Sequence, residues 1–262
     1  MRILLTNDDG ISAPGLRALV REFQPGNELF VVAPDTQRSA VSHACTFLNP
    51  IRLHPYGEKQ PGLEEYSING TPVDCVFLAL FHLLKDNPPD IVVSGVNMGA
   101  NMGYDVMYSG TVAAAMEASI HGRKAVAVSV ANRQPEHYDT AAILARRLVN
   151  RIMADQPGLE VPAQTLYNLN VPDLALEDIK GVQFTNMGLT IYNQYVVPRR
   201  DPWNREYYWL SGDQPAGQNL PGSDFAALQD GYASLSPIQV DCTNYRTLQH
   251  WRDNLQADLL AD

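Results

Sequence analysis

Long apolar runs and paired cysteines are both missing from this sequence. No stretch approaches the ~18 continuous apolar residues of a membrane span, and the opening run over 3–5 is too short for a signal peptide. The 3 cysteines, Cys45, Cys75 and Cys242, form no CxxC pair, which argues against a disulfide scaffold and a zinc knuckle. Unpaired thiols are typical of a reducing compartment, so we expect a cytoplasmic protein without a membrane partner.

Basic residues are also fewer than acidic ones. The 262 residues contain 19 Lys and Arg against 29 Asp and Glu, which gives a net charge of −10 at pH 7. Such a surface repels duplex phosphate and anionic membranes, so we expect no duplex nucleic acid as a partner. The sequence also has no GxxxxGK(S/T) motif and no GxGxxG after its first strand. P-loop and dinucleotide-binding proteins thereby lose their main support.

What the sequence does contain is a large apolar fraction, 45%, in short runs that alternate with helical patterns. Strands are expected over 2–6, 29–33, 91–94, 125–130 and 165–169, and helices over 16–23, 73–84, 111–121 and 139–153. Runs that are apolar throughout are typical of strands covered on both faces. The order of elements predicts a doubly wound, mostly parallel sheet of the Rossmann-like α/β class.

The character of the sequence changes near residue 181. Aromatic residues over 192–209 lie among arginines and prolines, and this mixture predicts a projecting β-hairpin arm. A short helix over 223–231, a strand over 232–240 and a closing helix over 244–260 follow. We therefore expect an α/β core over 1–180 that carries the functional site. The arm, the final strand and the C-terminal helix over 181–262 form one structural unit with that core.

Polar residues follow three of the expected strands. In an open doubly wound sheet, ligands bind beyond the carboxyl ends of the strands, so the loops near residues 7–10, 34–39 and 95–101 are expected to meet. Adjacent carboxylates such as Asp8 and Asp9 repel each other unless a cation lies beside them. With Ser39 and Asn97 they make an all-oxygen set that suits Mg²⁺, Mn²⁺ or Ca²⁺. The alternative is that Asp8 or Asp9 only caps the helix that begins near residue 13.

A fourth polar segment, Ser109-Gly110-Thr111, opens a helix of small residues. Free amide donors at a helix start, flanked by two hydroxyls, can hold a phosphate. The alternative is a plain N-cap at Ser109 or Thr111. Arg38 could add positive potential for the phosphate. His43 could donate a proton to a leaving oxygen, although loop histidines are more often solvated.

Taken together, these motifs resemble the SurE family, the survival-protein nucleotidases that dephosphorylate nucleoside 5′- and 3′-monophosphates. The resemblance is carried in order by Asn7-Asp8-Asp9-Gly10, Arg38-Ser39, Asn69-Gly70-Thr71-Pro72, Ser94-Gly95-Val96-Asn97-Met98-Gly99, Tyr108-Ser109-Gly110-Thr111-Val112 and Asn168-Leu169-Asn170-Val171-Pro172. It implies an α/β fold, one divalent ion at Asp8, Asp9, Ser39 and Asn97, and short polyphosphate as a further substrate. It also implies homodimers or homotetramers assembled through the arm and the C-terminal segment. This chain has Ala40 where many relatives have glycine.

The function predicted from these residues is that of a metal-dependent phosphomonoesterase. The ion would polarise the phosphoryl oxygens and activate a water, while Ser109, Gly110 and Thr111 fix the phosphate. Asp9 is a candidate general base or a ligand only, and Asp8 a candidate nucleophile; the sequence leaves these roles open. The rivals are a non-catalytic nucleotide-binding regulatory protein and a nucleotide-dependent transferase.

Overall fold

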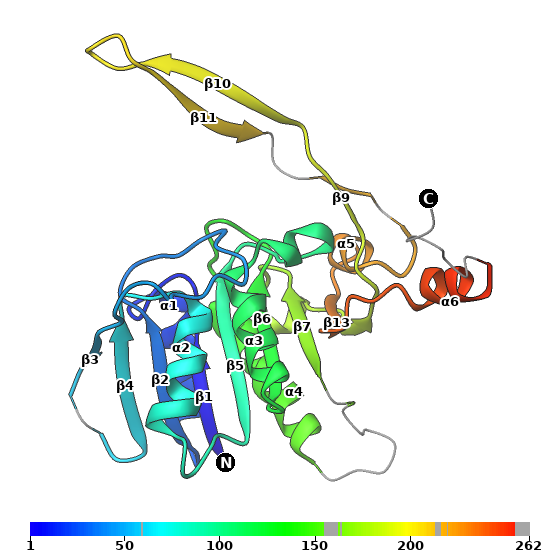
Figure 1. Ribbon diagram of the computed structural model, residues 1–262. Helices are drawn as coiled ribbons and strands as arrows, with labels where there is room; N and C mark the ends of the chain where they lie inside the picture. Colours follow the sequence, from blue (N-terminus) through cyan, green and yellow to red (C-terminus); the bar gives the residue numbers. More distant parts are fainter. Residues whose placement is uncertain (59, 155–161, 163, 213–215, 219, 255–262) are drawn as a thin grey trace.

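A central sheet with helices on both faces forms the body of the protein, and a hairpin projects from it (Figure 1). The computed structural model describes residues 1–58, 60–154, 162, 164–212, 216–218 and 220–254. The sheet has nine strands in the order β3-β4-β2-β1-β5-β6-β7-β13-β8. Six neighbouring strands, from β4 to β7, run parallel. The predicted α/β class with a mostly parallel sheet is confirmed.

The parallel strands are the apolar runs of the sequence, with one addition. They are β1 (Arg2–Thr6), β2 (Glu28–Pro34), β4 (Leu63–Ile68), β5 (Ile91–Met98), β6 (Lys124–Val130) and β7 (Thr165–Val171). The addition is β4, which was not predicted from the sequence because Glu64 and Glu65 interrupt its apolar pattern. Among the described strands, only the short antiparallel β3 (Leu53–Pro55) lies beyond β4. A strand next to the sheet edge is only partly covered, so it tolerates those charges.

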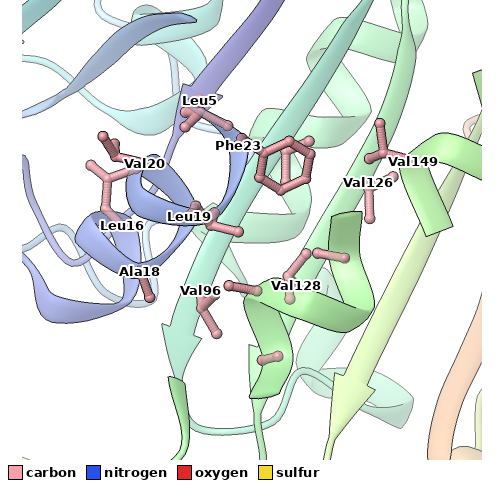
Figure 2. Close-up of a cluster of buried hydrophobic side chains, with 14 of the residues drawn as sticks. Leu5, Leu16, Ala18, Leu19, Val20, Phe23, Val96, Val126, Val128 and Val149 are labelled. Carbon is pink, nitrogen blue, oxygen red and sulfur yellow. The ribbon is translucent and has the colours of Figure 1, made fainter. Parts of the chain in front are cut away.

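Four helices cover the two faces of the parallel sheet. On one face, α1 (Pro14–Phe23) packs beside α4 (Tyr138–Met153). Figure 2 shows Leu19 and Phe23 of α1 among Leu5, Val126 and other side chains of the strands. On the other face lie α2 (Pro72–Leu78) and α3 (Gly110–Ile120). The small residues of α3 are fully buried against the sheet, so the start of this helix has a fixed position above the strand ends.

Two predicted elements differ from the observed ones by more than two residues at one end, and a third reaches beyond the described residues. The helix expected over 73–84 ends at Leu78 and continues as a π-helical turn, Ala79–Leu83, in which the Leu84 N–H donates to the Ala79 carbonyl at 2.8 Å. The strand expected over 91–94 extends to Met98, because a register shift against β6 lets pairing resume at Asn97. The closing helix is α6 (Tyr245–Asn254); its predicted continuation over 255–260 lies outside the described residues.

The segment after residue 180 contributes both to the sheet and to the arm. Strands β8 (Val182–Phe184) and β13 (Ala233–Gln239) join the sheet beyond β7, where β13 runs antiparallel to β7. The predicted hairpin is present as β10 (Gln194–Arg200) and β11 (Glu206–Gly212). At its base, β9 (Leu189–Ile191) pairs with β12 (Ala216–Gln218), and α5 (Asp224–Gln229) follows. Among the described helices, none is long and apolar enough to cross a membrane.

Candidate active site

The acidic pair lies at the point where the strand order reverses. After β1 the chain adds β2 on one side, and it later returns to add β5 on the other side of β1. The ends of β1 and β5 are in register, with Thr6 opposite Ser94. Asp8 and Asp9 follow β1, and Asn97 belongs to the end of β5. This crevice is where open α/β sheets bind their ligands.

Hydrogen bonds tie the three predicted loops together around these carboxylates. The side chain of Gln37 donates to Asp9 Oδ1 at 3.2 Å, and the backbone N–H of Met98 donates to Asp9 Oδ2 at 3.1 Å. The backbone N–H of Arg38 donates to the Asp8 carbonyl at 2.7 Å. The loop after β2 and the end of β5 are therefore both fixed to the turn that follows β1.

A pocket of about 730 Å³ opens at this meeting point. Asp8, Ser39, Asn97 and Ser109 all line it, although they come from four segments of the chain. Asp9 is bonded to two other lining residues, Gln37 and Met98. The structure thus brings the four oxygen-bearing residues proposed as metal ligands to one place and sets the start of α3 beside them.

Burial makes the acidic pair costly without a cation. Asp8 is 5% exposed. Its pKa is raised to about 6, mainly by burial; the Thr111 hydroxyl opposes this rise and the charge of Asp9 contributes to it. Burial also raises the pKa of Asp9. Both shifts disfavour the doubly ionised pair, and a divalent cation would remove that penalty.

The other donors suit a hard ion as well. The side-chain N–H of Asn97 donates to the Gly99 carbonyl at 2.7 Å, which leaves the amide oxygen of Asn97 as an acceptor. Carboxylate, hydroxyl and amide oxygens are the ligands that Mg²⁺ and Ca²⁺ prefer. No group of three or more His, Cys, Asp or Glu suited to a metal occurs among the described residues. A metal site here would therefore depend on the neutral oxygens of Ser39 and Asn97.

The interpretation of Asp8 or Asp9 as a helix cap is wrong. The N-cap of α1 is Ala13, which makes no side-chain capping bond. Instead, Asn7 closes the turn: its side chain donates to the Gly10 carbonyl at 2.9 Å and accepts from the Gly10 N–H at 3.2 Å. This role of Asn7 was not predicted from the sequence. Because Asn7 holds the turn, both aspartate side chains are free for other partners.

The start of α3 combines capping with contact to Asp8. Ser109 is the N-cap, and its hydroxyl accepts from the Val112 N–H at 3.1 Å, so the predicted capping role of Ser109 is confirmed. The Thr111 hydroxyl donates to Asp8 Oδ1 at 2.5 Å. A Cβ at Gly110 would lie 3.0 Å from Asp8 Cβ, so only glycine allows this close approach. The first N–H groups of a helix lack intrahelical acceptors, and the dipole there favours an anion.

Five of the predicted site residues are not among those that line the pocket. Asp9, Gly110 and Thr111 lie directly behind the lining, in contact with or next to residues that belong to it. Arg38 and His43 bind elsewhere. The Arg38 guanidinium lies 3.5 Å from Asp35 and 3.4 Å from the Asn69 carbonyl. His43 Nε2 lies 2.7 Å from Glu117 Oε2, and His121 Nε2 lies 2.9 Å from the other oxygen of Glu117. Burial alone would raise the pKa of Glu117, but the hydrogen bonds from both histidines outweigh it and lower that pKa. His43 therefore anchors its loop to α3.

The sheet and its switch point define a Rossmann-like α/β protein. Paired carboxylates and a helix start are groups that can bind a cation and an anion. The family model described as survival protein SurE matches residues 3–194. A 5′-nucleotidase SurE from Heliobacterium modesticaldum is 46% identical over 97% of this chain and 91% of its own length. Another, from Nitrosococcus oceani, is 47% identical over 95% of each chain. The chain therefore belongs to the SurE family.

A solved structure agrees with this assignment. The SurE protein from Aquifex aeolicus superposes with a TM-score of 0.82 at 33% sequence identity, and the match covers 97% of this chain and 99% of the other. The similarity thus extends beyond the parallel core to the arm and the final strand.

Proposed function

We propose that this protein is a metal-dependent phosphomonoesterase that hydrolyses nucleoside 5′- and 3′-monophosphates to nucleoside and phosphate. The observation that carries the proposal is the convergence of Asp8, Ser39, Asn97 and Ser109 on one pocket at the switch point of the sheet. Two relatives at 46% and 47% identity bear the name 5′-nucleotidase. Short polyphosphate is a proposed second substrate, because it presents the same terminal phosphoryl group.

One divalent ion, Mg²⁺, Mn²⁺ or Ca²⁺, would be held by Asp8, Asp9, Ser39 and Asn97. When bound, the ion polarises the phosphoryl oxygens and offsets their negative charge. The protein holds the ligands ready: Thr111 orients Asp8, while Gln37 and Met98 orient Asp9. Preorganised charge of this kind requires little rearrangement at the moment of reaction.

The phosphate would lie at the start of α3, against Ser109, Gly110 and Thr111. We assign the two catalytic carboxylates different tasks on the basis of their burial. Asp8 is almost fully enclosed and serves as a ligand. Asp9 is only partly buried, so in addition to contacting the ion it is assigned the role of the base that accepts a proton from the attacking water. Arg38 and His43 would support the phosphate indirectly, through the loop that carries Ser39.

The experiment that tests this function is an assay of phosphate release. Nucleoside 5′- and 3′-monophosphates are incubated with Mg²⁺ or Mn²⁺, with and without a chelator. Release that depends on the ion supports the proposal, whereas release that persists in chelator contradicts the role of the metal. Saturable nucleotide binding without any release would favour the regulatory protein.

We propose further that the chain forms a homodimer or homotetramer through the arm and the C-terminal segment. The hairpin exposes 63% of Trp209 and 86% of Leu210, and an isolated two-stranded hairpin is only marginally stable in water. Light scattering of the native protein gives its mass, and a monomer would contradict this proposal. We place the reaction in the cytoplasm because Cys45, Cys75 and Cys242 are unpaired thiols.

A further inference from the structure

The pocket is larger than a phosphate and an ion require. Beyond Asp8, its lining continues over Asn101, Met102, Asp105, Tyr108, Asn132 and Phe225, within a volume of about 730 Å³. If the proposed function holds, the phosphate occupies the end near Ser109, and the rest of the pocket meets the nucleoside. The inference that follows rests on that function and concerns this second half of the pocket.

Asp105 is the acidic residue of this half, and it is rigidly linked to the phosphate end. It belongs to the short 3₁₀ helix Gly103–Met107, which leads directly into α3. The Asp105 carbonyl accepts from the N–H groups of Tyr108 at 3.0 Å and Ser109 at 3.1 Å. A carboxylate and a phosphate-binding helix start therefore stand a few residues apart on one hydrogen-bonded segment.

The carboxylate of Asp105 is held by Tyr192, which lies between β9 and β10 at the base of the arm. The Tyr192 hydroxyl donates to Asp105 Oδ1 at 2.5 Å. Burial and this hydrogen bond raise the pKa of Tyr192 to about 12, so the hydroxyl keeps its proton near neutral pH. A carboxylate has about four acceptor positions. The bond to Tyr192 orients the group and leaves acceptor capacity for a ligand.

The backbone of this wall is fixed as well. Asp224, which is 0% exposed, accepts from the N–H groups of Gly103 and Gly188, each at 2.8 Å. The Thr190 hydroxyl accepts from the Tyr104 N–H at 3.0 Å. These bonds clamp the 3₁₀ helix to the base of the arm. A ligand that binds Asp105 would find the carboxylate already in place, which lowers the ordering cost of binding.

Charge decides which part of a nucleotide this carboxylate can accept. An anionic carboxylate repels phosphate and can only accept hydrogen bonds. A nucleoside monophosphate offers O–H donors on the ribose and, on some bases, N–H donors. The ribose is the part attached to the phosphate, so its hydroxyls are the donors nearest to an acidic residue that lies a few positions before the helix start. We propose that Asp105, oriented by Tyr192, is a specificity-determining residue that accepts hydrogen bonds from the ribose hydroxyls of the substrate. The enzyme thereby distinguishes nucleoside monophosphates, which carry free ribose hydroxyls, from phosphomonoesters that have none.

Three substrates test this proposal: AMP, its 2′,3′-dideoxy analogue and phenyl phosphate. The selectivity ratio is kcat/KM for AMP divided by kcat/KM for the dideoxy analogue. We expect a ratio of about tenfold or more in the native protein, since hydrogen bonds to charged groups discriminate strongly. Asp105→Ala brings the ratio close to one, and Asp105→Asn, which retains one acceptor oxygen, gives an intermediate value.

Tyr192→Phe removes only the orienting hydroxyl and lowers the ratio by about two- to fivefold, the range of a single neutral hydrogen bond. Tyr195→Phe makes the same chemical change on the exposed strand β10 and leaves the ratio unaltered. If Asp105→Ala fails to fold, Tyr192→Phe decides the question. An unaltered ratio in either pocket variant overturns the proposal, and so does an equal loss on all three substrates, which would mark a purely structural role.

Calorimetric titration separates this inference from the proposed function. The Kd of AMP and of the dideoxy analogue is measured in chelator, where the proposed function predicts no turnover, for the native protein and for Asp105→Ala. A preference for AMP that disappears in the variant supports ribose recognition even if no phosphate is released. Equal Kd values in the native protein overturn it, even if phosphate release is robust.

Discussion

The central sheet and the arm are both built from β-strands, but only the sheet has its own core. In β1 the side chains of Ile3, Leu4 and Leu5 are 0% exposed, because helices cover both faces. In the arm, Trp209 and Leu210 remain largely exposed, and among the described strands β10 and β11 pair only with each other. The sheet can therefore hold side chains at its strand ends in fixed positions, whereas the arm presents surface.

The largest effect is expected for Asp8→Asn, which tests whether the strand ends of the sheet carry out the reaction. Loss of one charged ligand in a site with only two carboxylates should lower ion-dependent phosphate release by about a thousandfold or more. The replacement has nearly the same shape, so circular dichroism should remain unchanged. Retention of more than about a tenth of the native kcat/KM in this variant would remove Asp8 from the ion site.

Replacing one leucine in the sheet and one in the arm by alanine compares how much each region contributes to the free energy of unfolding. Leu4→Ala leaves a cavity in a core that is packed on both sides, and we expect the free energy of unfolding to fall by about 2–5 kcal/mol. Leu210→Ala removes a side chain that is 86% exposed, and we expect a change within about 0.5 kcal/mol. Urea denaturation at low protein concentration measures both. Equal effects would mean that the arm has a core of its own.

The buried acidic pair makes the sheet sensitive to pH when no ion is present. Because burial raises the pKa of Asp8 from 3.8 to about 6, the folded state binds a proton more tightly than the unfolded state. The stability that protonated Asp8 provides is complete below pH 4 and is lost as the pH rises through 6. The loss is about 3 kcal/mol.

The measurement is the free energy of unfolding in chelator between pH 4 and 7, for the native protein and for Asp8→Asn. The difference between the two should grow with pH and should vanish when Mn²⁺ is restored, because the ion binds only the folded pair. A constant difference across this range would show that Asp8 titrates normally.

The smallest expected effect concerns the arm. Trp209→Ser should alter kcat/KM for phenyl phosphate by less than about twofold, because Trp209 lies outside the pocket. The same variant should reduce the mass seen by light scattering if the arm forms the subunit contact. If this variant has the mass and the activity of the native protein, Trp209 does not take part in assembly.

The sequence predicts the sheet well and the local contacts of the site poorly, for physical reasons. Uninterrupted apolar runs such as 3–5 and 91–93 predict buried parallel strands. Because ligands bind beyond the carboxyl ends of such strands, the residues that follow them, among them Asp8 and Asn97, are expected to lie together. Strand β4 is not predicted because its charged residues interrupt the apolar pattern.

Partners across long separations have no sequence signature. Thr111 is 103 residues from Asp8, and Tyr192 is 87 residues from Asp105. The sequence identifies Thr111 as part of the site, but only the packing of α3 turns its hydroxyl to Asp8. His43 is another example, since its pairing with Glu117 depends on how the loop after β2 folds back onto α3.

The position of β13 in the sheet has a consequence for synthesis of the chain. Residues 1–171 contain the six neighbouring parallel strands from β4 to β7, so this part can collapse as soon as it leaves the ribosome. Strand β7 then forms an open edge with unpaired N–H and C=O groups until residues 233–239 emerge and cover it. The nascent protein is thus most prone to aggregate while the arm is being translated.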